Sequence, residues 1–161
     1  ITSSDDGATT VRGGAYSASG AASYSIDLQG SGVNKVELTS ISGQRADARV
    51  EIDLSKSSSA ELTVAGAVKN LNYVGGDGND TILIKGATSD SSFALGKGTN
   101  ALYAVKSNDP AATATSGFQA MKNVNITSSD DGATTVRGGA YSATNTTDII
   151  QLDGTGNNTV E

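Results

Sequence analysis

The residues of this chain best suited to chemistry are the oxygen donors of one glycine-rich stretch, Gly75–Leu83, with the sequence GGDGNDTIL. Glycine permits turns that expose carbonyl oxygens, and carbonyl and carboxylate oxygens are the ligands that calcium prefers. The stretch fits the nonapeptide G-G-x-G-x-D-x-U-x, in which U is an apolar residue after the turn. It therefore predicts a calcium site at the turn that contains Asp77 and Asp80. No catalytic residue and no other cofactor is predicted.

Three further turns share the pattern G-x-G-x-[ND]-x-U, at residues 30–36, 96–102 and 154–160, and each has Asn in place of Asp80. Two interpretations stay open for these turns. They bind calcium, or Gly and Asn simply permit a tight corner in which stacked Asn amides form hydrogen bonds from coil to coil. The structural interpretation is favoured for the group as a whole, because calcium-binding turns follow one another as serial nonapeptides and residues 84–92 do not continue the pattern.

Composition limits the classes of fold and function. Only 36% of the 161 residues are apolar and 4% are aromatic, which favours an elongated fold with a thin core over a compact globule. The net charge of −6 argues against nucleic acid and anionic membranes as partners. Cys and His are absent, which excludes disulfides and His-based catalysis, and no apolar run reaches the length of a membrane span.

A long internal repeat determines the expected domain organisation. Residues 1–18 recur without change at residues 126–143, an offset of 125. The chain therefore divides into one full long repeat, residues 1–125, and the start of the next copy, residues 126–161. We expect the chain to be a window from a longer protein that continues the same repeat.

Shorter repeats inside the long one predict the fold. The apolar residue after each turn falls at spacings of 25, 26, 20, 20, 34 and 24 residues, at Val11, Val36, Leu62, Ile82, Leu102, Val136 and Val160. Spacings of about 20–26 residues are those of one coil of a parallel β-solenoid, an all-β fold. The 34-residue spacing contains the single proline, Pro110, and predicts a loop insertion near residues 106–117. The alternative architecture is a series of tandem β-sandwich modules with antiparallel strands.

Alternation of apolar and polar residues and β-branched content predict the strands. These are Tyr24–Leu28, Lys35–Ser40, Arg49–Leu54, Glu61–Val64, Leu71–Val74, Thr81–Lys85, Ser92–Leu95, Ala101–Val105, Lys122–Thr127, Thr134–Arg137 and Asp148–Leu152.

Three segments resemble the repetitive regions of large RTX-type bacterial surface proteins, namely S-layer proteins and giant adhesins. They are Gly75–Leu83, the pair LTVAGA and ILIKGA at residues 62–67 and 82–87, and FQAMKNVNIT at residues 118–127. The resemblance implies secretion, calcium-assisted folding outside the cell and a structural or adhesive role. The calcium ligands of that family carry over only to Gly76, Gly78 and Asp80, with Asp77 as a helper. The isolated nonapeptide favours a wider solenoid than a compact calcium roll.

The sequence thus predicts a mechanical function and no enzymatic activity, because an unchanged block repeated along a chain is typical of an array. We expect a structural repeat segment of a secreted filament, S-layer or adhesin protein on a bacterial cell surface, stabilised by calcium at one turn. The expected partners are identical repeats or neighbouring chains, and a cell-surface polysaccharide is a further partner that the sequence leaves open. A carbohydrate-binding or carbohydrate-active β-helix is the alternative function, and it would require a groove with clustered carboxylates.

Overall fold

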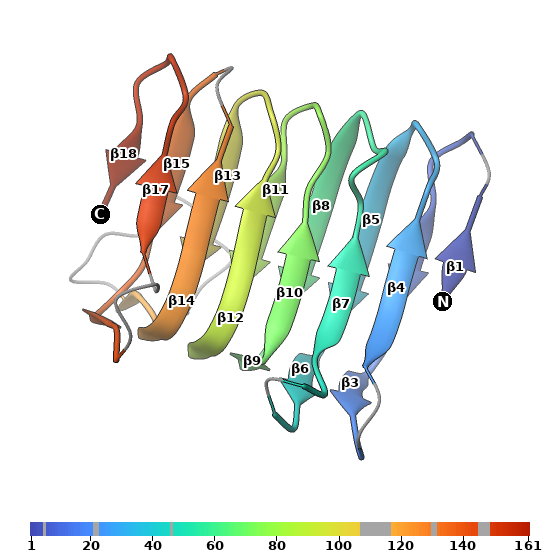
Figure 1. Ribbon diagram of the computed structural model, residues 1–161, viewed down its shortest axis with the longest axis horizontal. Helices are drawn as coiled ribbons and strands as arrows, with labels where there is room; N and C mark the ends of the chain where they lie inside the picture. Colours follow the sequence, from blue (N-terminus) through green and yellow to red (C-terminus); the bar gives the residue numbers. More distant parts are fainter. Residues whose placement is uncertain (5, 21–22, 46, 107–116, 130–131, 145–148) are drawn as a thin grey trace.

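The computed structural model describes residues 1–4, 6–20, 23–45, 47–106, 117–129, 132–144 and 149–161. Its elements are β-strands, arranged side by side across the long axis of the molecule (Figure 1). In chain order they are β1 Thr2–Ser3, β2 Thr10–Arg12, β3 Ala15–Ala18, β4 Tyr24–Leu28, β5 Val33–Leu38, β6 Ser40–Gly43, β7 Val50–Asp53, β8 Ser59–Val64, β9 Val68–Lys69, β10 Leu71–Val74, β11 Thr81–Ile84, β12 Thr88–Leu95, β13 Asn100–Ala104, β14 Met121–Ser128, β15 Thr134–Arg137, β16 Tyr141–Ser142, β17 Ile150–Leu152 and β18 Thr159–Val160.

The strands form two sheets, and the chain passes from one to the other repeatedly. The first sheet has 11 strands, and the second has 7, in the order β18-β15-β13-β11-β8-β5-β2. Every ladder between these strands is parallel. The prediction of an all-β chain with parallel sheets is confirmed. The alternative of tandem β-sandwich modules required antiparallel ladders, which the described strands do not form.

We use the word coil for each passage of the chain through both sheets, and we number the coils 1 to 7 by the seven strands of the second sheet, from β2 to β18. Neighbouring coils are in register. The apolar residues predicted to follow each turn align as Val11↔Val36↔Leu62↔Ile82↔Leu102↔Val136↔Val160. The spacings in the sequence therefore reflect direct strand pairing.

The core is a set of apolar columns between the two sheets. One column of the first sheet contains Ile26, Ile52, Tyr73, Phe93 and Ile126, all of which are at most 1% exposed. Each such side chain contributes about 1.5–3 kcal/mol by leaving water. The column thus supplies one buried apolar side chain in each of coils 2 to 6.

Coils 1 to 6 each also have a third, short strand that the sequence did not predict. These strands are β3, β6, β9, the first residues of β12 and β14, and β16. A sharp corner precedes the next coil at Asn70, Asp90 and Asn123, which have φ of 51°, 51° and 53°. Asn and Asp tolerate this left-handed conformation better than other residues with a side chain, and so they mark the corner.

The predicted strand bounds agree well with the structure. β4, β10 and β15 have the predicted bounds, and the other predicted strands differ at one or both ends. Asp148, the first residue of the last predicted strand, lies outside the described residues. Residues 107–116 of the predicted loop insertion lie outside the described residues. On either side of them the backbone N–H of Lys106 donates to the carbonyl of Gly117 at 2.7 Å. Lys106 and Gly117, which flank those residues in the sequence, therefore lie side by side.

Candidate functional site

The predicted calcium turn belongs to a column of turns that connects the first sheet to the second. Strand register places one residue of each coil in this column: Thr9, Asn34, Ala60, Asp80, Asn100, Thr134 and Asn158. Asn34, Asp80, Asn100 and Thr134 are buried, at 0%, 0%, 1% and 1% exposure. The candidate site is therefore a polar column of turn residues, interrupted by the buried Ala60 in coil 3.

Asn34 shows how an amide serves this column. Its Oδ1 accepts the backbone N–H of Thr9 in the preceding coil at 2.8 Å. Its Nδ2 donates to the carbonyl of Gly30 in its own turn at 2.7 Å and to the hydroxyl of Ser57 in the following coil at 2.8 Å. One side chain thus joins three consecutive coils and leaves no buried polar atom without a partner, which makes it costly to remove.

The same arrangement recurs at Asn100 and Asn158. Asn100 Oδ1 accepts the N–H of Asp80 at 3.0 Å and its Nδ2 donates to the carbonyl of Gly96 at 2.9 Å. Asn158 Oδ1 accepts the N–H of Thr134 at 2.9 Å, and its Nδ2 donates to the carbonyl of Gly154 at 3.1 Å. These amides therefore join neighbouring coils through backbone N–H groups, whereas the structural interpretation expected stacked Asn amides to bond to one another.

Asp80 occupies the same place with a carboxylate, which can only accept hydrogen bonds when ionised. Its Oδ1 accepts the N–H of Ala60 at 2.9 Å and its Oδ2 accepts the N–H of Gly76 at 3.0 Å. Burial raises the pKa of Asp80 from 3.8 to about 6, although hydrogen bonds from the N–H groups of Ala60, Gly76 and Gly96 act in the opposite direction. The charge of Asp77 also raises this pKa.

The four predicted calcium ligands, Gly76, Asp77, Gly78 and Asp80, lie in one turn but differ in burial. Asp80 is buried, whereas Asp77 is exposed. Both carboxylate oxygens of Asp80 accept a backbone N–H group. Among the described residues, no group of three or more Asp, Glu, His or Cys side chains lies together. The geometry of Asp80 therefore gives no support to a calcium ion at Gly76, Asp77, Gly78 and Asp80, and the site stays a sequence prediction.

The glycines of these turns are explained by the close stacking of neighbouring coils. A Cβ added to Gly96 would lie 1.6 Å from the carbonyl oxygen of Gly76, and one added to Gly76 would lie 2.1 Å from that of Ser57. Real atoms cannot approach this closely, and so the turns can stack only if Gly76 and Gly96 carry no side chain. The G-x-G pattern is thus accounted for without a metal.

The outward face of the second sheet carries ion pairs between neighbouring coils. Arg12 pairs with Glu37 and Lys35 with Glu61, at 2.5 and 2.8 Å. The hydrogen bond from Arg12 is the main cause that lowers the pKa of Glu37. These groups are exposed, and so the pairs help to fix the register more than they add to stability.

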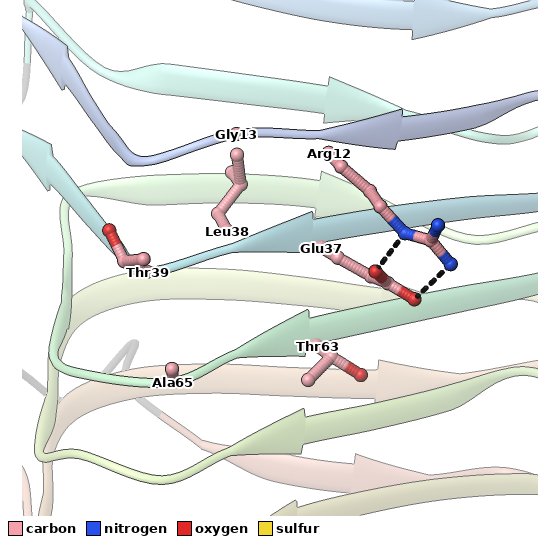
Figure 2. Close-up of a pocket in the computed structure, with 7 residues that line it drawn as sticks. All are labelled: Arg12, Gly13, Glu37, Leu38, Thr39, Thr63 and Ala65. Carbon is pink, nitrogen blue, oxygen red and sulfur yellow. Dashed lines mark hydrogen bonds and ion pairs between the residues drawn. The ribbon is translucent and has the colours of Figure 1, made fainter.

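A shallow open groove of about 260 Å³ lies beside the first of these pairs (Figure 2). Its lining residues are Arg12, Gly13, Glu37, Leu38, Thr39, Thr63 and Ala65. Glu37 supplies the one carboxylate of the groove, and the dashed lines in Figure 2 mark its contacts with Arg12. The groove lacks the carboxylate cluster that a carbohydrate-active site would require.

Sequence reasoning missed the partners that complete the polar column. Ser57 and the N–H of Ala60 bind the amide and the carboxylate of neighbouring coils, yet neither belongs to a G-x-G turn. It also missed the corner column of Asn70, Asp90 and Asn123, in which Asn123 Nδ2 donates to Asp90 Oδ1 at 2.9 Å. The 20-residue offset between Asn70 and Asp90, residue types that tolerate positive φ, was the signal that could have found it.

Comparisons of the chain with models of protein families, with curated proteins and with solved structures gave no match. The described residues contain no helix that is long and apolar enough to cross a membrane. The function must therefore be inferred from the geometry of the chain itself.

Proposed function

We propose that this chain is a structural segment of a secreted, tandemly repeated bacterial cell-surface protein of the S-layer or adhesin type, and that it forms a parallel β-solenoid. Its function is mechanical: it supplies a stiff rod that separates or connects other parts of the protein. The proposal assigns no enzymatic activity to the segment. Its natural partners are further copies of the same repeat.

One observation carries this proposal. The two identical blocks, residues 1–18 and 126–143, take the same place in coils 1 and 6. Between β2 and β15 the second sheet contains β5, β8, β11 and β13, so that the long repeat corresponds to five steps of the ladder. At a strand separation of about 4.8 Å, one repeat advances the rod by about 24 Å. Each further repeat would continue the ladder without a break.

The hydrogen-bond pattern supports stiffness. Parallel backbone ladders join every pair of neighbouring coils in both sheets, and the Asn and Asp side chains of the turn column add bonds along the axis. Bending such a rod would lengthen many of these bonds together. A carbohydrate-binding β-helix is the second candidate function, and the open groove beside Arg12 is the observation that favours it.

Electron microscopy of the intact repeat protein tests the proposed rod. We expect a smooth fibre of constant width whose length increases by about 24 Å per 125-residue repeat. Beads at intervals of one repeat would overturn the proposal in favour of separate modules. A glycan array probed with the chain, and with an Arg12→Ala variant as control, would test the carbohydrate alternative, and Arg12-dependent binding would favour it.

Calcium is tested separately, by thermal unfolding with added calcium and with a chelator. Because N–H groups face both carboxylate oxygens of Asp80, we expect the same melting temperature in the two conditions. A rise with calcium that is lost in the Asp77→Asn variant would instead support the calcium site predicted from the sequence.

A further inference from the structure

The outward face of the second sheet carries four rows of side chains that run along the stacked coils. In coil 2 the rows, which we number 1 to 4, contain Val33, Lys35, Glu37 and Thr39, and the residues between these are buried. Coil 2 has a neighbouring coil on each side, because β5 pairs with both β2 and β8. The exposure of its outward side chains therefore belongs to the lateral face of the molecule.

The four rows of coil 2 are complementary to themselves. Val33 and Thr39 stand at equal distances from the point midway between Lys35 and Glu37, since successive outward residues are two positions apart. A two-fold axis that runs along the rod through this point exchanges rows 2 and 3, and also rows 1 and 4. A second copy turned about this axis would bring its Lys35 opposite Glu37 and its Glu37 opposite Lys35.

The same axis brings an exposed apolar side chain onto an open groove. Val33, in row 1, is 39% exposed. The shallow groove of about 260 Å³ includes Thr39 of row 4 together with Leu38, and its lining residues Gly13 and Ala65 come from coils 1 and 3 (Figure 2). Gly13 and Ala65 have little or no side chain with which to fill it. Val33 of the second copy would lie over this groove and lose its contact with water.

Coils 4 and 5 continue the fit by size. Strand register places Leu83 and Tyr103 in row 3, and Thr81 and Ala101 in row 2. Exchange of these rows sets Leu83 opposite Thr81 and Tyr103 opposite Ala101 of the second copy. Each large side chain thus faces a small one, which lets two flat sheets approach closely along several coils.

We propose that two copies of this chain pair side by side in the same direction, through the outward faces of their second sheets. The inference rests on the proposed rod, because only stacked coils present a continuous face. Four rows on the seven strands of the second sheet make a face of about 20 by 34 Å, or about 1,400 Å² over both copies. That area lies within the usual size of a specific interface.

Charge selects the direction of the pair. Two antiparallel copies centred on coil 2 would keep each row opposite itself, so that Lys35 would face Lys35 and Glu37 would face Glu37. In the parallel pair, the ion pairs of each chain join across the contact instead. Glu37, which pairs with Arg12, would meet Lys35 of the second copy, which pairs with Glu61. Opposite charges then alternate along the contact.

Sedimentation velocity of charge-exchanged chains, from micromolar to millimolar concentration, is the test. Lys35→Glu and Glu37→Lys each oppose like charges in a pair of identical copies, and so either alone should associate about tenfold or more weakly than the unchanged chain. An equal mixture of the two should associate as the unchanged chain does, because one copy then presents two acidic and the other two basic side chains. Lys122→Glu and Glu51→Lys make the same charge changes at exposed positions of the first sheet and should have no effect, alone or mixed. Circular dichroism verifies that each variant is folded.

Two further measurements test the groove and the direction. Val33→Asn introduces the residue type that stands at the corresponding place of coil 7, Asn157, and should weaken association about tenfold. Because the chain has no cysteine, Asn157→Cys carries a single spin label. We expect the labels of a parallel pair to lie about 20–30 Å apart, whereas an antiparallel pair centred on coil 2 separates them by about 48 Å along the rod.

A chain that stays monomeric at every concentration overturns the lateral pair. So does a mixture of Lys35→Glu and Glu37→Lys that associates no better than either variant alone, and so does a label distance of about 48 Å or more. None of these results affects the proposed rod, whose coils stack within one chain. Beaded images would overturn the rod, and with it the continuous face on which the pair depends.

Discussion

Replacing Asp80 by Asn should remove a defined part of the pH dependence of stability. The carboxylate is buried among N–H donors, and burial raises its pKa from 3.8 to about 6. Because this pKa is higher in the folded than in the unfolded chain, the folded chain binds the proton more tightly. The resulting stabilisation is fully present below about pH 4 and is lost as the pH rises through about 6.

The size of the effect follows from the pKa difference. One pKa unit corresponds to about 1.4 kcal/mol, and so the shift of Asp80 has an upper value of about 3 kcal/mol. The turn lies near the surface, with Asp77 and Asn79 exposed beside it. Solvent screening reduces the expected change in unfolding free energy to about 2 kcal/mol. For a chain of this length that corresponds to about 4–8 °C in melting temperature.

The assay is urea unfolding of the unchanged chain and of Asp80→Asn at about pH 4 and about pH 7.5. Asn can keep the bond from Ala60, as Asn34 keeps the bond from Thr9, but it cannot titrate. The stability of the variant relative to the unchanged chain should therefore rise by about 2 kcal/mol between the two pH values. Asp77→Asn, at an exposed position of the same turn, is the control and should change little. An equal difference at both pH values would refute the buried, proton-binding role of Asp80.

Three further substitutions test the coil-to-coil contacts. Asn34→Ala should lower the free energy of unfolding in urea by about 2–4 kcal/mol, because the N–H of Thr9, the carbonyl of Gly30 and the hydroxyl of Ser57 lose their partner. Asn157→Ala, at an exposed position, is the control and should have no effect. Equal effects of the two substitutions would contradict the polar column. Gly96→Ala should cost about 3 kcal/mol or more in thermal unfolding because its Cβ would overlap the Gly76 carbonyl of the preceding turn. Gly14→Ala, where an added Cβ would meet nothing within 4 Å, is its control. Ile82→Ala should cost about 2–5 kcal/mol by the same measurement, and a cost below about 1 kcal/mol would mean that the inward column is not the core.

Much of the fold was predictable because the pattern that specifies it is local and repeated. The spacing from Val36 to Leu62 to Ile82 matches the strand register, since each apolar residue pairs directly with its counterpart one coil away. The third strand of each coil was not predictable in this way. β9 and β16 have only two residues each, and Lys69 and Ser142 give no alternating pattern to detect.

The candidate site was predictable in position but not in chemistry. The sequence indicated that Asp80 and Asn100 occupy equivalent turns, and the register agrees. It could not show whether the oxygens of Asp80 face a cation or N–H groups, because the donor at Ala60 comes from another coil and has no side-chain signature. Backbone groups are the same at every position of a sequence, so that only the folded arrangement identifies which of them meet a carboxylate.

Residues 1–18 and 126–143 occupy the same positions within their coils, and this limits how a protein built from such repeats can change its length during evolution. A gene that gains or loses one 125-residue unit gains or loses a whole number of turns of the ladder. The segments on either side then meet with their strands in phase and with their faces pointing in the same directions. In the proposed rod, length could therefore change in steps of one repeat while the surfaces and corners of the coils stay the same.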